Sequence, residues 1–225
     1  MQAKHHPLAF WAAAVFLIPA IVLAAGCNLP GTKPHIMVKQ WTLEYKPPQS
    51  AASQLPASIK IMRFQAAQAV IGAEMIYRPQ PNERGSYNYN RWLVSPSDLV
   101  GDFLLRDLRA ESSFIAVYSD RQPQRPRFRL EGGVEEFLEI DSGEAWHAAL
   151  KVNLTLLDTK RKRITKRLLF QRNYAFTSKM SNKNPDGLAK AMSQAMAKFS
   201  AQARADIYKA IEKALQKPLP KDTRD

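Results

Sequence analysis

Apolar and polar side chains alternate along several short segments of the chain, which is the pattern of strands in a half-buried sheet. The alternation is clearest after Trp146, where an apolar side chain falls at every second position up to Leu156. Gly132 and Gly133 predict a β-bulge in an earlier strand, and residues 158–162 are the predicted turn before the last one. The pattern predicts strands over residues 41–45, 58–64, 70–78, 87–91, 114–118, 127–141, 146–156 and 164–176.

Two longer segments change to helical spacing, with apolar residues three or four positions apart. The first follows Ser95, a predicted N-cap with Pro96 at the first helical position, and its apolar stripe ends at Leu108. The second covers residues 185–216 behind Asn184, another predicted N-cap. The order of strands, helix, strands and helix predicts an α+β fold, with a mixed or antiparallel sheet and both main helices on one face.

An uncharged apolar run precedes the only cysteine of the chain. Residues 8–23 carry no charge, Lys4 stands before them, and small residues lead to Gly26 and Cys27. This is the pattern of a bacterial lipoprotein signal, so we expect cleavage between Gly26 and Cys27 and a lipid anchor on the cysteine. The alternative is an uncleaved anchor. The run is shorter than the roughly 20 residues that span a bilayer, and Pro19 interrupts it.

The remaining sequence predicts one domain between two irregular segments. We expect a signal peptide over residues 1–26, a lipidated flexible tether over 27–40, a single α+β domain over 41–217 and a polar tail over 218–225. Apolar residues make up 45% of the chain, which is enough for a buried core. Once Cys27 is acylated, no thiol is left for a disulfide or a cysteine metal site.

The chain is strongly basic, with 33 Lys and Arg against 20 Asp and Glu. In an exported protein we expect this excess to meet anionic lipid headgroups or an acidic protein surface, not nucleic acid. The basic residues that gather at the last predicted turn are Lys160, Arg161, Lys162 and Arg163, followed by Lys166 and Arg167. They are candidate contacts with an anionic surface. The alternative is a solvated turn that protects an edge strand from pairing.

Aromatic and arginine side chains gather in a second place. Tyr87, Tyr89 and Arg91 share one face of a short predicted strand, and Trp92 follows them. This combination is enriched at protein interfaces, so the four residues are a candidate partner interface. Core packing explains Trp92 equally well.

The sequence gives no indication of catalysis or of a cofactor. Beyond the signal the chain has only His35 and His147, and neither has a second ligand at a metal spacing. The acidic residues between 131 and 144 indicate a solvated strand face; the alternatives are an acid–base pair or a contact surface for a basic neighbour. No nucleophile elbow, phosphate-binding glycine loop or dinucleotide fingerprint is present. We therefore expect a protein that is not an enzyme and holds neither metal nor cofactor.

Several motifs together carry a family resemblance: the lipidation signal, Trp41-Thr42-Leu43, Met75-Ile76-Tyr77-Arg78, Tyr87-Asn88-Tyr89-Asn90-Arg91-Trp92, Ser95-Pro96 and the terminal helix. With them the chain resembles the ABC-type transport auxiliary lipoprotein family over nearly its whole mature length. The resemblance implies a periplasmic accessory subunit on a palmitate-bearing lipid anchor, whose partner is an MCE-domain protein of a lipid transporter. Asn28 stands where an aspartate retains many lipoproteins in the inner membrane, so we expect the bacterial outer membrane. A homo-oligomeric ring would suit this role.

Two other functions stay open. The domain would be an autonomous lipid carrier if it held an apolar cavity. It would be a structural or assembly lipoprotein of the outer membrane if it had no transporter as its partner.

Overall fold

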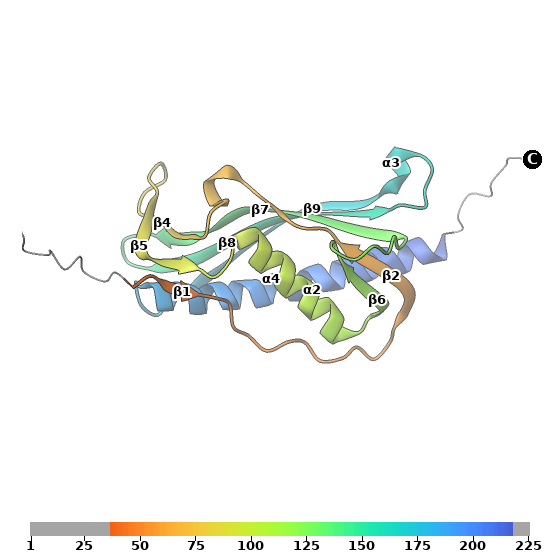
Figure 1. Ribbon diagram of the computed structural model, residues 1–225, viewed down its shortest axis with the longest axis horizontal. Coiled ribbons are helices and arrows are strands. Elements are labelled where there is room, and N and C mark those ends of the chain that lie inside the picture. The colour runs from red at the N-terminus through yellow and green to blue at the C-terminus, as the bar shows by residue number, and fades with distance from the viewer. Residues whose placement is uncertain (1–36, 218–225) are drawn as a thin grey trace, which may run out of the picture. The chain divides into compact units, whose positions relative to one another are not determined.

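A mixed sheet of nine strands curls into a half-barrel around two helices (Figure 1). The computed structural model describes residues 37–217, and those from Val38 onward belong to one compact unit. The predicted α+β class is confirmed. The strands are β1 (Lys39–Trp41), β2 (Leu55–Ile61), β3 (Gln65–Ala66), β4 (Glu74–Arg78), β5 (Gly85–Trp92), β6 (Phe114–Ser119), β7 (Phe128–Asp141), β8 (Trp146–Asp158) and β9 (Leu168–Lys179). The helices are the short 3₁₀ turn η2 (Gln68–Val70), α2 (Pro96–Glu111), α3 (Ile164–Arg167) and α4 (Pro185–Gln216).

Strand β7 organises the sheet. Along one edge it pairs antiparallel with β8 over its whole length, from Phe128 opposite Asp158 to Asp141 opposite Trp146. Along its other edge β2, β3 and β4 pair with it in parallel, one after another. The sheet continues through β9 beyond β8, through β6 beyond β2, and through β5 and β1 beyond β4.

Capping residues set the starts of both long helices. The amide of Asp98 donates to Ser95 Oγ over 3.3 Å in α2, and the amide of Gly187 donates to Asn184 Oδ1 over 2.8 Å in α4. Both are the predicted N-caps, and α4 has the predicted bounds. At 1.5 Å per residue, α4 is roughly 48 Å long.

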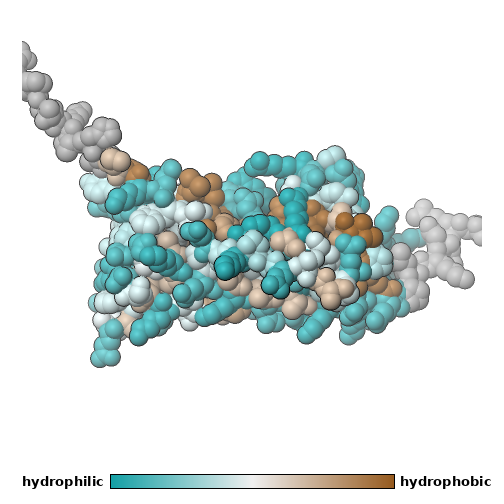
Figure 2. All heavy atoms as spheres, turned by 90° about the horizontal axis from the view of Figure 1, so that it is seen from below, coloured by the Kyte–Doolittle hydropathy of each residue, from teal (hydrophilic) through white to brown (hydrophobic). Residues whose placement is uncertain are grey.

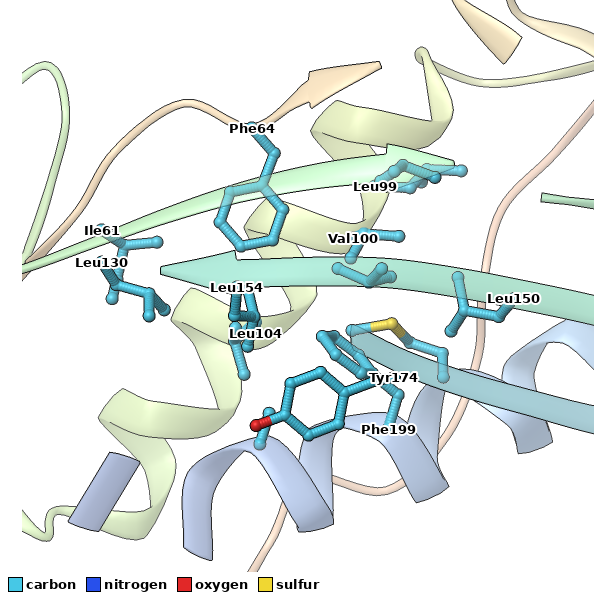
Figure 3. Packing of buried hydrophobic residues seen from close by; sticks show 14 of the residues in the cluster. Ile61, Phe64, Leu99, Val100, Leu104, Leu130, Leu150, Leu154, Tyr174 and Phe199 are labelled. Carbon is cyan, nitrogen blue, oxygen red and sulfur yellow. The ribbon is translucent and has the colours of Figure 1, made fainter. Parts of the chain in front are cut away.

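Both helices pack on the concave face of the sheet, as predicted (Figure 3). Leu104 of α2 and Phe199 of α4 are fully buried in one cluster with Leu150 and Leu154 of β8. The ring of Phe199 also meets Tyr174 of β9 edge-on, with centroids 5.6 Å apart. Side chains of the protein's own helices therefore fill the inside of the half-barrel.

The bulge in β7 does not lie at the two glycines. Gly132 and Gly133 pair regularly with β8, and the register shifts only between Val134 and Glu136. Gly132 instead leaves room for Phe64, because a Cβ atom at this position would lie 2.5 Å from the ring. The predicted position of the bulge was wrong, since the missing side chain serves packing here and not backbone bending.

Four of the predicted strands have clearly different bounds. The first ends at Trp41, because the backbone then leaves β5 and turns toward α4, where the amide of Glu44 donates to Ser193 Oγ over 2.9 Å. Strand β2 starts and ends a few residues earlier than predicted, and β4 covers only the second half of the third predicted strand. Residues 164–167 form α3, so the last strand begins at Leu168.

The segment between β1 and β2 ties α2 to α4. Leu43 in this segment is buried, and the hydroxyl of Tyr45 donates to Asp107 of α2 over 2.7 Å. The same carboxylate accepts a hydrogen bond from Ser200 of α4 over 2.6 Å. Figure 2 shows the molecule from this side, where most residues are hydrophilic and apolar ones are exposed in small groups.

Candidate functional site

The structure separates the four residues of the candidate partner interface. Trp92 is only 1% exposed, and its ring meets Phe137 edge-on with centroids 4.9 Å apart. Tyr87 is half-buried, whereas Tyr89 and Arg91 are exposed. Trp92 is therefore a core residue and is removed from the candidate interface, because β5 turns this side chain inward at its end.

Exposed apolar residues that the sequence analysis missed lie near Tyr89 and Arg91. Leu93 and Val94 follow β5 and are 53% and 39% exposed, and Val38 precedes β1 and is 50% exposed. Because β1 pairs with β5, these residues lie along one edge of the sheet. We call Val38, Tyr89, Arg91, Leu93 and Val94 the β5 surface. Two apolar residues directly before the cap of α2 were the signal that could have indicated it.

A buried carboxyl group links β7 to β5. Glu139 is completely buried, and its Oε2 accepts a hydrogen bond from the hydroxyl of Tyr87 over 2.8 Å. Burial raises the pKa of Glu139, and the bond from Tyr87 offsets this only in part. The pKa of Tyr87 is raised as well, first by burial and then by the carboxyl group. Glu139 is closed off from solvent, whereas Tyr87 is partly exposed, so the carboxyl group joins β7 to β5 and does not itself face solvent.

The predicted basic turn joins β8 to α3. Lys160, Lys162 and Arg163 are exposed, but Arg161 is half-buried, with its Nε 3.1 Å from Oδ2 of Asp158. Burial would raise the pKa of Asp158, but hydrogen bonds from two arginines outweigh it and hold this pKa below its usual range. Arg161 therefore fixes the turn, and the other three basic residues present their side chains to solvent.

The remaining observations concern metal sites, membrane-spanning helices and the other residues named from the sequence. Within residues 37–217, no group of three His, Cys, Asp or Glu side chains could hold a metal ion, and no helix is long and apolar enough to cross a membrane. His147 is half-buried on β8. The predicted cleavage, lipidation and sorting residues, Gly26, Cys27 and Asn28, lie outside the described residues, as does His35.

Comparisons with known proteins give a family and a fold. The model of the family described as ABC-type transport auxiliary lipoprotein component matches residues 41–203. No curated protein matches the chain.

Solved structures share the architecture at low sequence identity. A crystal structure of a Xanthomonas campestris protein of the DUF330 family aligns with a TM-score of 0.69 and 18% identity, covering 80% of this chain and 100% of that chain. A crystal structure of an uncharacterized protein aligns with a TM-score of 0.58 and 15% identity, covering 76% of this chain and 99% of that chain. At these identities the likeness concerns the fold alone.

Proposed function

The chain belongs to the ABC-type transport auxiliary lipoprotein component family, and from this premise we propose that it is a non-enzymatic accessory subunit of an ABC-type lipid transporter that works through an MCE-domain protein. The observation that carries the proposal is the family match, which runs from the end of β1 into α4. A family of lipoproteins implies that the chain is anchored to a membrane.

The proposed anchor is the acylated thiol of Cys27, with palmitate among its fatty acids. Asn28 follows the acylated residue and favours the outer membrane, with the folded domain in the periplasm. The anchor holds the domain at the membrane, and the domain docks on the transporter. Neither anchoring nor docking needs a catalytic group, and the carboxyl of Glu139, which is hydrogen-bonded to Tyr87, is buried.

The filled interior of the half-barrel favours an accessory role over that of an autonomous lipid carrier. A carrier needs an apolar cavity that encloses most of its ligand. On the concave face Leu104 and Phe199 occupy the space that acyl chains would need, and both are fully buried. The domain therefore offers its surface, and not its interior, to other molecules.

The β5 surface is the proposed docking site for the transporter. Tyr89 is 50% exposed, and Arg91 stays more than half exposed although it lies 3.8 Å from Glu74. Exposed tyrosine and arginine beside the apolar Leu93 and Val94 give the combination that interface hot spots favour.

Affinity capture from solubilised envelopes tests the proposal. We expect the full chain to recover an MCE-domain protein, and the double variant Tyr89→Ala with Arg91→Glu to recover at least about 10-fold less. Arg125→Glu is the matched control, because it makes the same charge change at an exposed arginine away from β5. A preparation that holds phospholipid but no transporter component would contradict the accessory role and favour the carrier. Recovery of outer-membrane assembly proteins alone would favour the assembly lipoprotein.

A further inference from the structure

A basic groove lies between the start of β9 and the C-terminal part of α4. It has a volume of about 620 Å³, and its lining includes the apolar residues Leu168, Phe170 and Ala210. Asp206 is the one acidic residue of its lining. The basic residues of the lining are Arg161, Lys166, Arg172, Lys209, Lys213 and Lys217. We call this site the α3–α4 groove.

Two of the six basic residues form ion pairs within the protein. Arg161 is paired with Asp158, and Arg172 lies 2.8 Å from Oδ1 of Asp206. Burial would raise the pKa of Asp206, but hydrogen bonds from Arg172 and Tyr174 outweigh it and keep this carboxyl ionised. The one acidic group of the groove is therefore already matched by an arginine.

The other four basic residues keep their charge available. Lys166, Lys209, Lys213 and Lys217 form no ion pair with another described residue. Lys209 and Lys213 lie four residues apart on the same face of α4, where like charges repel, and Lys217 is the residue directly after the helix. The helix dipole favours cations in the last turn. That effect does not explain Lys209, which lies two turns before the end, or Lys166, which comes from α3.

Exposed apolar side chains stand beside this charge. Ile164 at the start of α3 is 80% exposed, and Leu168 directly after α3 is 46% exposed. The residues around them on the turn and on α3 are basic, namely Lys160, Lys162, Arg163, Lys166 and Arg167. An apolar tip surrounded by cations is the pattern of segments that lie in the headgroup region of an anionic membrane. An acidic protein surface would match the lysines but would leave Ile164 without a partner.

The geometry of the domain lets this end reach the membrane. In Figure 1, α3 lies at the opposite end of the sheet from β1. The segment after β1 is hydrogen-bonded to Ser193 of α4. The distance along the helix from Ser193 to Lys217 is roughly 36 Å. The chain between Cys27 and Lys39 can extend to about 40 Å. A domain anchored at Cys27 can therefore lie along the membrane and bring the α3 end to its surface.

We propose that α3 and the α3–α4 groove form a binding surface for anionic phospholipid membranes, independent of any contact with a transporter. The four unpaired lysines bind headgroup phosphates, and Ile164 with Leu168 enters the interface between headgroups and acyl chains. The bound domain then holds its long axis along the membrane and keeps the β5 surface in a defined orientation.

An environment-sensitive fluorophore on α3 tests this inference. The full chain carrying Thr165→Cys is labelled with a nitrobenzoxadiazole dye and reconstituted into phosphatidylcholine vesicles with or without phosphatidylglycerol. Parent chain treated in the same way gives the background, because its only cysteine, Cys27, takes up dye only where it is not acylated. We expect a blue shift that grows with the phosphatidylglycerol content and falls with added salt. The same emission in both kinds of vesicle would overturn the proposal.

Charge variants separate the groove from the general charge of the protein. Replacing Lys209, Lys213 and Lys217 by Gln removes three headgroup contacts, which corresponds to a roughly 100-fold lower ratio of inserted to free α3. The control replaces three other exposed lysines, at positions 39, 46 and 198, and should keep the shift. Both triple variants should keep the melting temperature of the parent, and an equal loss in both would contradict a specific surface. The same shift with inorganic phosphate or polyglutamate alone would assign the groove to free anions or to an acidic protein and overturn the membrane proposal.

Discussion

The buried carboxylate of Asp107 gives the sharpest test of how the domain is held together. Asp107 is 1% exposed and accepts hydrogen bonds from Tyr45 over 2.7 Å, from Ser200 over 2.6 Å and from Arg106 Nε over 2.8 Å. These three donors belong to the segment after β1, to α4 and to α2 itself. One carboxylate therefore joins three parts of the chain that are far apart in sequence.

The structure gives an expected magnitude for Asp107→Ala. The hydroxyl of Ser200 is 1% exposed and would lose its acceptor, at a cost of about 1–3 kcal/mol. The half-buried hydroxyl of Tyr45 would add about 1 kcal/mol, and Arg106 less, because its side chain still reaches solvent. A loss of about 3 kcal/mol lowers the melting temperature of a domain of this size by roughly 10 °C.

Thermal unfolding followed by circular dichroism measures this loss. Asp102→Ala is the matched control, because it makes the same change at an exposed position of the same helix and should stay within about 0.5 kcal/mol of wild type. Combining Asp107→Ala with Ser200→Ala should cost less than the sum of the two, since the second change removes the orphaned donor. A melting temperature for Asp107→Ala equal to that of the Asp102 control would refute the reasoning.

Three further predictions concern packing, titration and capping. Gly132→Ala should destabilise by about 1–3 kcal/mol through the clash with Phe64, and adding Phe64→Leu should recover part of this loss in urea unfolding. The pKa of Glu139 is raised in the folded state, so the folded protein loses stability as the pH rises above the usual range of a glutamate. In calorimetry, Glu139→Gln should have the melting temperature of wild type at about pH 4 and a higher melting temperature than wild type at about pH 8. A difference in melting temperature that does not change with pH would contradict this. Asn184→Ala removes the N-cap of α4 and should cost about 1 kcal/mol, seen as a melting temperature lower by roughly 3 °C.

The elements that could be predicted from the sequence are those with local signals. The bounds of α4 follow from Asn184 and Pro185 at its start and from its apolar spacing, all within one segment. The antiparallel run of β7, β8 and β9 follows from period-two patterns in segments that are neighbours in the sequence. The order in which β2, β3 and β4 pair along β7 could not be predicted, because parallel pairing joins distant segments and leaves no mark in local periodicity.

The candidate surfaces were predictable only in part, for a similar reason. The pattern around Tyr89 and Arg91 indicated an interface, but the burial of Trp92 depends on its contact with Phe137, which is distant in sequence. Likewise, the basic turn could be recognised in the sequence, but only folding brings it beside Lys209 of α4 to line one groove. In both cases the outcome depends on contacts between residues that are distant in sequence.

The central claim is that this domain docks on an MCE-type transporter through the β5 surface, and site-specific photocross-linking in cells tests it most directly. A photoreactive residue at Tyr89 should yield an adduct with an MCE-domain protein by mass spectrometry, and one at the exposed Gln171 of β9 should not. Adducts with such a protein at Gln171 but not at Tyr89 would contradict the docking surface. Absence of an MCE-domain protein from the adducts at both positions would contradict the accessory role itself.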